Sequence, residues 1–194
     1  MTQIKKLKNS TLELKNVYAL AGIAMLLALR VVLGCFGNGT LAFFGNNVKL
    51  SGAFLPIAIT GAMFGPVPAA LVGAFGDIIS LLIVPTGGPY FPGFTISGIL
   101  TGLIYGFAFY KNNVNIPRVI IAWIINAITV EIFIAAYWLY LINGAGPIEI
   151  YFTYLVPRFI SRAILCVPEI LLILGVGKLA AKLHLPQNLR KRNA

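Results

Sequence analysis

Residues 85–95 read Pro85-Thr86-Gly87-Gly88-Pro89-Tyr90-Phe91-Pro92-Gly93-Phe94-Thr95 and lie between two strongly apolar runs. Proline removes a backbone donor and glycine opens conformations that other residues avoid, so neither flanking helix continues through this stretch. A plain connection does not need three aromatic rings. We interpret the stretch as a lid over a binding site; the alternative is an aromatic belt at a membrane interface.

The composition indicates an integral membrane protein. Hydrophobic residues make up 59% of the 194 residues and charged residues only 10%, far from the averages of soluble domains. The net charge is +10, but the basic residues gather at the chain ends and in one loop, without a basic stripe interleaved with aromatic residues. We therefore expect the lipid bilayer as the surroundings of the chain and no nucleic-acid partner.

Hydropathy predicts the fold class, because a helix needs roughly 20 apolar residues to cross a bilayer. We expect an all-α integral membrane protein, a six-transmembrane-helix bundle with an outward-facing binding pocket. Residues 1–194 then form a single membrane domain with basic tails at 1–15 and 183–194. The spans are expected near 17–36, 53–65, 68–84, 94–110, 117–142 and 150–181. The second and third are short, so the alternative is a re-entrant hairpin in a four-span protein.

The basic residues predict the orientation of this bundle. With six spans, eleven Lys and Arg residues lie on one side, and only Lys49 lies in a loop on the other. The positive-inside rule then places both termini in the cytoplasm. The loops at 37–50, 85–93 and 143–149 consequently face outward, and we expect the binding site on that face.

Six ionisable residues fall within the predicted spans: Arg30, Asp77, Glu131, Arg158, Arg162 and Glu169. Each costs roughly 2.5–3.5 kcal/mol at the bilayer centre on insertion scales, so each needs a compensating interaction. Three basic and three acidic residues allow internal ion pairs to account for all six. The other interpretation is that the arginines bind an acidic ligand.

One helical face of the last span favours a ligand. Its members are spaced by three, four and four residues: Tyr151, Tyr154, Arg158 and Arg162. Tyrosine rings stack on flat molecules, and a guanidinium donates two parallel hydrogen bonds to a carboxylate, so this stripe suits a flat, acidic ligand. Glu169 continues the stripe about two turns deeper and is expected to orient Arg162.

The fifth span offers acceptors for a heterocycle. Glu131 and Trp138 are predicted to share one face, as are Asn126 and Thr129. A carboxylate or an amide there accepts hydrogen bonds from ring amines, although Glu131 suits an ion pair equally well.

The chain lacks the residues of common catalytic sites. No phosphate loop of the form G-x-x-x-x-G-K-[ST] occurs, and the single histidine, His184, lies beyond the last span. We therefore expect neither a catalytic nor a metal site.

The chain resembles the substrate-binding S components of energy-coupling factor (ECF) vitamin transporters, and within them the folate group. The resemblance covers nearly the whole chain. Its most specific part is Gly73-Ala74-Phe75-Gly76-Asp77 followed by residues 85–95, which is similar to the folate-group signature. Ala24 and Ala28 are similar to the AxxxA motif that docks such subunits on a shared transmembrane T subunit. Arg30 lies about 200° around the helix from Ala28, so the charge and the docking face point in opposite directions.

The resemblance implies a non-enzymatic subunit of a bacterial cell membrane that captures folate or a reduced folate from outside. It implies a T subunit and two cytoplasmic ATPase subunits as partners and no cofactor, folate being the cargo. The rings of folate suit stacking, its pterin edge donates hydrogen bonds, and its glutamate tail carries two carboxylates. The expected contacts are Tyr90, Phe91, Phe94, Tyr151 and Tyr154 for the rings, Arg30, Lys49, Arg158 and Arg162 for the tail, and Asn126 and Glu131 for the pterin edge.

Three alternatives stay open. The first keeps the family but changes the cargo to a pyridoxine-like vitamin, pantothenate or a thiamine precursor. The second is a membrane-embedded lipid enzyme with Asp77 and Glu131 as acid and base. The third is a structural subunit whose glycine faces serve only assembly.

Overall fold

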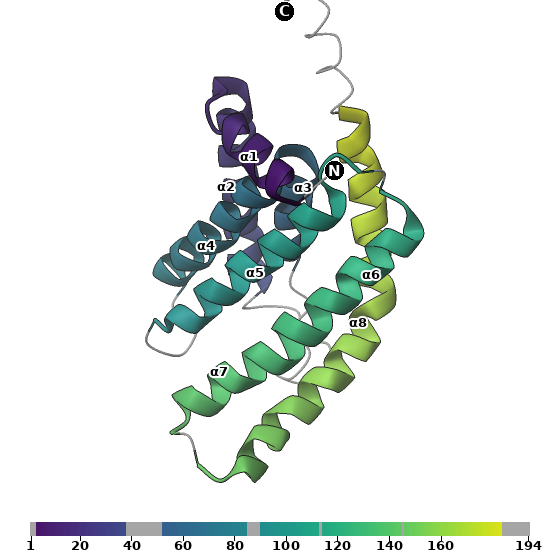
Figure 1. Ribbon diagram of the computed structural model, residues 1–194. Helices are drawn as coiled ribbons and strands as arrows, with labels where there is room; N and C mark the ends of the chain where they lie inside the picture. The colour runs from purple at the N-terminus through teal and green to yellow at the C-terminus, as the bar shows by residue number, and fades with distance from the viewer. Residues whose placement is uncertain (1–2, 38–51, 85–89, 113, 145, 184–194) are drawn as a thin grey trace, which may run out of the picture.

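The computed structural model describes residues 3–37, 52–84, 90–112, 114–144 and 146–183, and its regular elements in these ranges are helices (Figure 1). They are α1 Gln3–Glu13, α2 Val17–Gly37, α3 Phe54–Phe64, α4 Pro66–Ile83, α5 Pro92–Phe109, α6 Ile116–Asn126, the π-helix η1 Ala127–Ile134, α7 Ala135–Ile142 and α8 Ile148–Leu183. The predicted all-α membrane fold is confirmed. Lys49 and residues 85–89 of the predicted lid lie outside the described residues.

Helices occupy all six predicted spans, with α6, η1 and α7 together forming the fifth, and the boundaries agree to within two residues. Within the described residues, five segments are long and apolar enough to cross a membrane: Val17–Cys35, Pro66–Ile83, Pro92–Phe109, Ile116–Ile142 and Ile148–Gly177. The other predicted span is α3, which has only 11 residues. At about 1.5 Å per residue α3 reaches roughly half-way across a hydrocarbon core.

Proline and glycine set the helix boundaries. Pro66 and Pro92 are the first residues of α4 and α5, and Pro117 is the second residue of α6. Proline fits there because the first N–H groups of a helix have no helical acceptor. Gly65 alone separates α3 from α4, with φ = +96°, a conformation that favours glycine.

Glycines also bring α4 and α5 into close contact. A Cβ atom on Gly73 would collide with the carbonyl group of Gly98, and one on Gly102 with that of Ala69. Such small-residue contacts let two membrane helices approach backbone to backbone. The glycines on α4 and α5 therefore serve helix packing.

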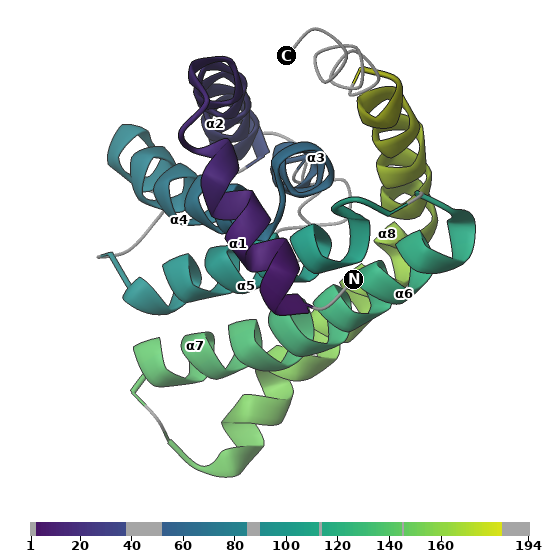
Figure 2. The same cartoon turned by 45° about the horizontal axis from the view of Figure 1, so that its top comes forward.

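The helices form two groups that meet at α5. Helices α2 to α5 pack on one another, and α6, η1 and α7 run antiparallel to α8 (Figure 1). The rotated view shows α5 between the two groups (Figure 2). A core of Tyr105, Phe109, Trp123 and Ile173 joins α5 to α6 and α8.

Helix α1 is absent from the predictions, which treat residues 1–15 as a tail. Ser10 is fully buried, where its Oγ donates to Phe64 O and accepts from Val67 N, both at 3.1 Å. Lys6 Nζ donates to Phe107 O at 2.9 Å, near the C-terminal end of α5, where the helix dipole favours a cation. Helix α1 thus fastens the α3–α4 turn and the end of α5, and we call this end of the bundle the α1 end.

The π-helix changes which residues share a face. Asn126 is buried, whereas Thr129 is exposed and donates its hydroxyl to Ile125 O at 2.6 Å. The prediction that Asn126 and Thr129 share a face is therefore wrong, because it assumed α-helical turns throughout. The wider turns of η1 begin at Ala127, immediately after Asn126.

Candidate ligand-binding site

Helix α8 directs its polar stripe into the bundle. The predicted stripe residues are all partly buried: Tyr151, Tyr154, Arg158 and Arg162. Four of the intervening apolar residues are exposed: Phe152, Val156, Phe159 and Ile160. The shared face that the spacing predicts is therefore confirmed, and it lies toward η1 and α7.

Arg162 is held by two carboxylates. Its Nη2 lies 2.9 Å from Glu131 Oε2, and its Nη1 lies 2.8 Å from Glu169 Oε1. Glu169 also accepts a hydrogen bond from Trp123 Nε1 at 2.7 Å. Glu169 thus orients Arg162, as the sequence predicts. Arg162 and Glu131 form an internal ion pair, which is one of the two interpretations that the sequence left open. This pairing favours a structural role for both residues over their predicted roles as contacts of the ligand tail and the pterin edge.

Arg158 has a different environment one turn nearer the start of α8. Its Nη1 donates to the backbone oxygen of Glu131 at 3.2 Å. Among the described residues, no carboxylate oxygen lies within 4.0 Å of its guanidinium. A carbonyl group carries no net charge, and the carboxylate of Glu131 attracts Arg158 only from beyond 4.0 Å.

Arg30 reaches from α2 to α4 along a path that glycine leaves open. A Cβ atom on Gly76 would lie 2.5 Å from Arg30 Cγ, and one on Gly34 would lie 2.7 Å from Nη1. Its Nε is buried and has no hydrogen-bond partner within the described ranges. In the described part of the chain, Arg30 likewise has no carboxylate within 4.0 Å. Asp77 attracts it electrostatically from farther away.

Asp77 instead ends a chain of hydroxyl groups. Thr95 Oγ1 donates to Asp77 Oδ2 at 3.0 Å, and the Tyr90 hydroxyl lies 2.9 Å from Thr95 Oγ1. This chain joins the last residues of the predicted lid to α4. The sequence analysis named Tyr90 and Asp77 but not Thr95. The position of Thr95 at the end of the same aromatic stretch was the feature that could have pointed to it.

Phe91, in the predicted lid, packs against α7. The Phe91 ring lies 6.1 Å from that of Phe94 and 5.6 Å from that of Trp138, measured between centroids. Trp138 Nε1 donates to Ser97 Oγ at 3.0 Å, which links α7 to α5. Phe91 and Phe94 are thus next to each other, as they must be to contact the same ligand ring. Trp138 is a further neighbour. The sequence placed it on one face with Glu131 but did not name it as a ligand contact.

The tyrosines of α8 lie beside the end of α7. The Tyr151 and Tyr140 rings meet edge to face at 6.2 Å, and the Tyr151 hydroxyl donates to Phe133 O at 3.4 Å. Tyr154 is partly buried one turn later. Asn126 is buried and its side chain hydrogen-bonds to Tyr105, but its Oδ1 has no partner among the described residues and so remains an acceptor for a donor group.

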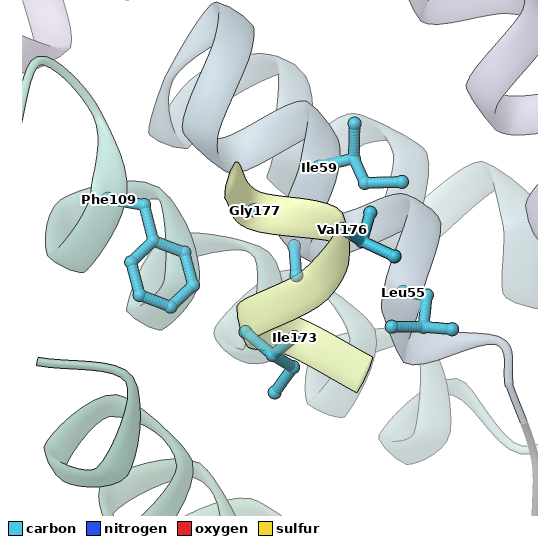
Figure 3. A pocket seen from close by; sticks show the side chains of 7 residues that line it. Leu55, Ile59, Phe109, Ile173, Val176 and Gly177 are labelled. Carbon is cyan, nitrogen blue, oxygen red and sulfur yellow. The ribbon is translucent and has the colours of Figure 1, made fainter. Parts of the chain in front are cut away.

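A small pocket between α3, α5 and α8 is not this site. It has a volume of ≈ 10 Å³ and an apolar lining that includes Leu55, Phe109 and Ile173 (Figure 3). A cavity of that volume holds about one water molecule. The polar residues above line none of it.

The predicted docking alanines are on the outside of the bundle. Ala24 and Ala28 are exposed on α2, whereas Arg30 is partly buried against α4. The opposed directions that the helical spacing predicts are therefore confirmed.

Residues 19–177 match the family model of the substrate-specific component of ECF transporters. The chain belongs to this family. This ECF S component is 31% identical over 180 residues to the folate transporter FolT of Clostridium novyi (strain NT), a match that covers 93% of this chain and 99% of that one. It is also 33% identical over 91 residues to FolT of Leuconostoc mesenteroides, which covers 47% of this chain and 46% of that one.

A solved structure gives the same result for the fold. The S component superposes on a crystal structure of FolT bound with folic acid with a TM-score of 0.72 and 30% sequence identity, covering 85% of this chain and 98% of that chain. The family predicted from residues 73–77 and 85–95 is therefore confirmed, and with it a multi-pass membrane protein of transport function.

Proposed function

We propose that this S component binds folate or a reduced folate outside a bacterial cell and delivers it inward as part of an ECF importer. The supporting observation is the pair of arginines, Arg30 and Arg158, that have no carboxylate partner among the described residues. Two cations in a membrane bundle are costly unless an anion joins them. Folate brings two carboxylates, and the folate transporters similar to this chain support that choice over other vitamins.

The surrounding side chains fit the remainder of folate. Phe91, Phe94, Tyr151 and Tyr154 supply ring faces for the flat pterin and benzoyl groups. Asn126 Oδ1 is an acceptor for the pterin amines. Lys49 stays a predicted tail contact outside the described residues.

Membership of the family supports the proposed partners. A T subunit would dock on the exposed Ala24 and Ala28, and two cytoplasmic ATPase subunits would hydrolyse ATP, so the S component itself needs no catalytic residues or cofactor. The basic ends of the chain support cytoplasmic termini and a site that opens outward.

Equilibrium titration of the purified full-length chain in detergent tests the proposal. The fluorescence of Trp123 and Trp138 gives a signal, and calorimetry gives an independent one. We expect folic acid to bind and pyridoxine, pantothenate and thiamine to leave the signal unchanged. Binding of one of these three without binding of folic acid would keep the transport family but overturn folate as the cargo.

A further inference from the structure

The hydroxyl chain from Tyr90 to Asp77 has a direction. Thr95 has one hydroxyl hydrogen, which it donates to Asp77 Oδ2 at 3.0 Å. At the 2.9 Å contact with Tyr90, Thr95 Oγ1 must therefore accept. The Tyr90 hydroxyl donates to Thr95, Thr95 donates to Asp77, and the chain ends on a carboxylate, which as an anion only accepts.

This direction decides what Tyr90 offers to a ligand. Its single proton is committed to Thr95, while its oxygen keeps acceptor capacity. Thr95 is nearly buried, with 9% of its surface exposed, but Tyr90 is 49% exposed. Tyr90 can thus meet a ligand while Thr95 and Asp77 hold its hydroxyl from behind.

We propose that Thr95 and Asp77 are positioning residues that fix the Tyr90 hydroxyl as a hydrogen-bond acceptor, so that Tyr90 selects an N–H group of the ligand. The ligand carboxylates are then left to Arg30 and Arg158. The proposal rests on the proposed function, since it takes folate as the ligand of Tyr90, a ring contact that the sequence predicts, and it goes further by assigning a polarity to that contact.

The position of Asp77 distinguishes a positioning role toward Thr95 and Tyr90 from the role of a counterion for Arg30. A counterion for Arg30 would contact the guanidinium, yet Asp77 has no oxygen within 4.0 Å of it and accepts the Thr95 proton instead. A charged acceptor at the end of a hydroxyl chain also polarises and strengthens the bonds before it.

A double-mutant cycle with folic acid as the probe tests the proposal. The variants are Tyr90→Phe, Thr95→Val, both together, and Thr95→Ser as the matched control that keeps the hydroxyl. We expect Tyr90→Phe and Thr95→Val each to raise the Kd about 3- to 10-fold, the effect of one hydrogen bond. The double variant should bind no more weakly than the weaker single one, because both remove the same contact, and Thr95→Ser should bind like wild type.

Losses that multiply in the double variant, or a wild-type Kd for Thr95→Val, would overturn the positioning role. If Thr95→Val does not fold, Asp77→Asn replaces it in the cycle. The amide of the introduced asparagine can donate to Thr95 and so reverse the direction of the hydrogen bonds between Tyr90 and residue 77. Asp77→Asn should then weaken binding in the wild-type background but not in the Tyr90→Phe background, and equal weakening in both would contradict the proposal. A wild-type chain that does not bind folic acid overturns the proposed function as well.

Discussion

Arg158 donates to the backbone oxygen of Glu131 at 3.2 Å, while the carboxylate of the same Glu131 lies 2.9 Å from Arg162. Two arginines one turn apart on α8 therefore share one neighbour in two different ways. Arg162 pairs directly with the Glu131 carboxylate, whereas Arg158 contacts the uncharged carbonyl group and is attracted by the carboxylate only from farther away. The two arginines consequently have different expected roles: Arg162 stabilises the bundle, and Arg158 remains available to an anion.

Replacing each of these arginines by glutamine should separate the roles. Arg158→Gln should raise the Kd for folic acid about 10- to 100-fold, the effect of a lost hydrogen bond to a charged group, and change stability little. Arg162→Gln should lower the free energy of unfolding by about 3–5 kcal/mol, because it leaves two carboxylates without their cation. Thermal unfolding in detergent and folic acid titration measure the two effects. A reversed pattern, with Arg158→Gln as the unstable variant, would refute the assignment.

A bulky residue on the exposed face of α2 should block transport without affecting binding. Ala24→Trp adds a large ring where the T subunit is proposed to dock and points away from Arg30. We expect an unchanged Kd for folic acid and the loss of folate uptake in cells that contain the whole transporter. Ala163→Trp is the matched control, since Ala163 is also exposed but lies on α8. Equal uptake by the two variants would argue against this docking face.

The sequence predicted the positions of the helices well because apolar length and the prolines at the helix starts act locally. It missed α1, since the contacts of Lys6 and Ser10 are to backbone groups that only the folded bundle brings together. It also missed η1, because its apolar sequence carries no mark of the π-helical turn.

The contact between α4 and α5 should tolerate no side chain at its glycines. Gly102→Ala places a methyl group against the Ala69 carbonyl and should destabilise the protein by about 1–3 kcal/mol. Gly175→Ala on α8 is the control, because a Cβ atom there meets nothing within 4 Å. It should leave stability unchanged or raise it by up to about 1 kcal/mol, the gain in helix propensity. Thermal unfolding of both variants in one detergent tests this difference, and equal midpoints would contradict the close packing.

Removing the hydroxyl of Ser10 should loosen the α1 end. Ser10→Ala leaves Phe64 O and Val67 N without this partner and should cost about 1–3 kcal/mol. Thr11→Ala is the control, because its hydroxyl is exposed and bonds only within α1, to Lys8 O. Hydrogen exchange at the α3–α4 turn should rise in Ser10→Ala and stay constant in Thr11→Ala. Unchanged exchange in both would show that α1 does not fasten the turn.

The sequence supplied the residues of the candidate site but not their pairing. The spacing of Tyr151, Tyr154, Arg158 and Arg162 placed them on one inward face, since helical periodicity fixes such a face. Which arginine meets Glu131 depends on how η1 packs against α8, a tertiary contact that one helix cannot reveal. The same limit applies to Thr95, whose bond to Asp77 joins α5 to α4.

The most direct test of the account is the Kd of the double variant Arg30→Gln/Arg158→Gln for two ligands, folic acid and 6-hydroxymethylpterin, measured by calorimetry. The second ligand has the pterin ring but no carboxylate. If the two arginines bind the acidic tail, the double variant should bind folic acid at least about 100-fold more weakly than wild type, as expected for two lost charged hydrogen bonds. Its affinity for 6-hydroxymethylpterin should match that of wild type. An equal loss for both ligands, or no loss for folic acid, would contradict the claim.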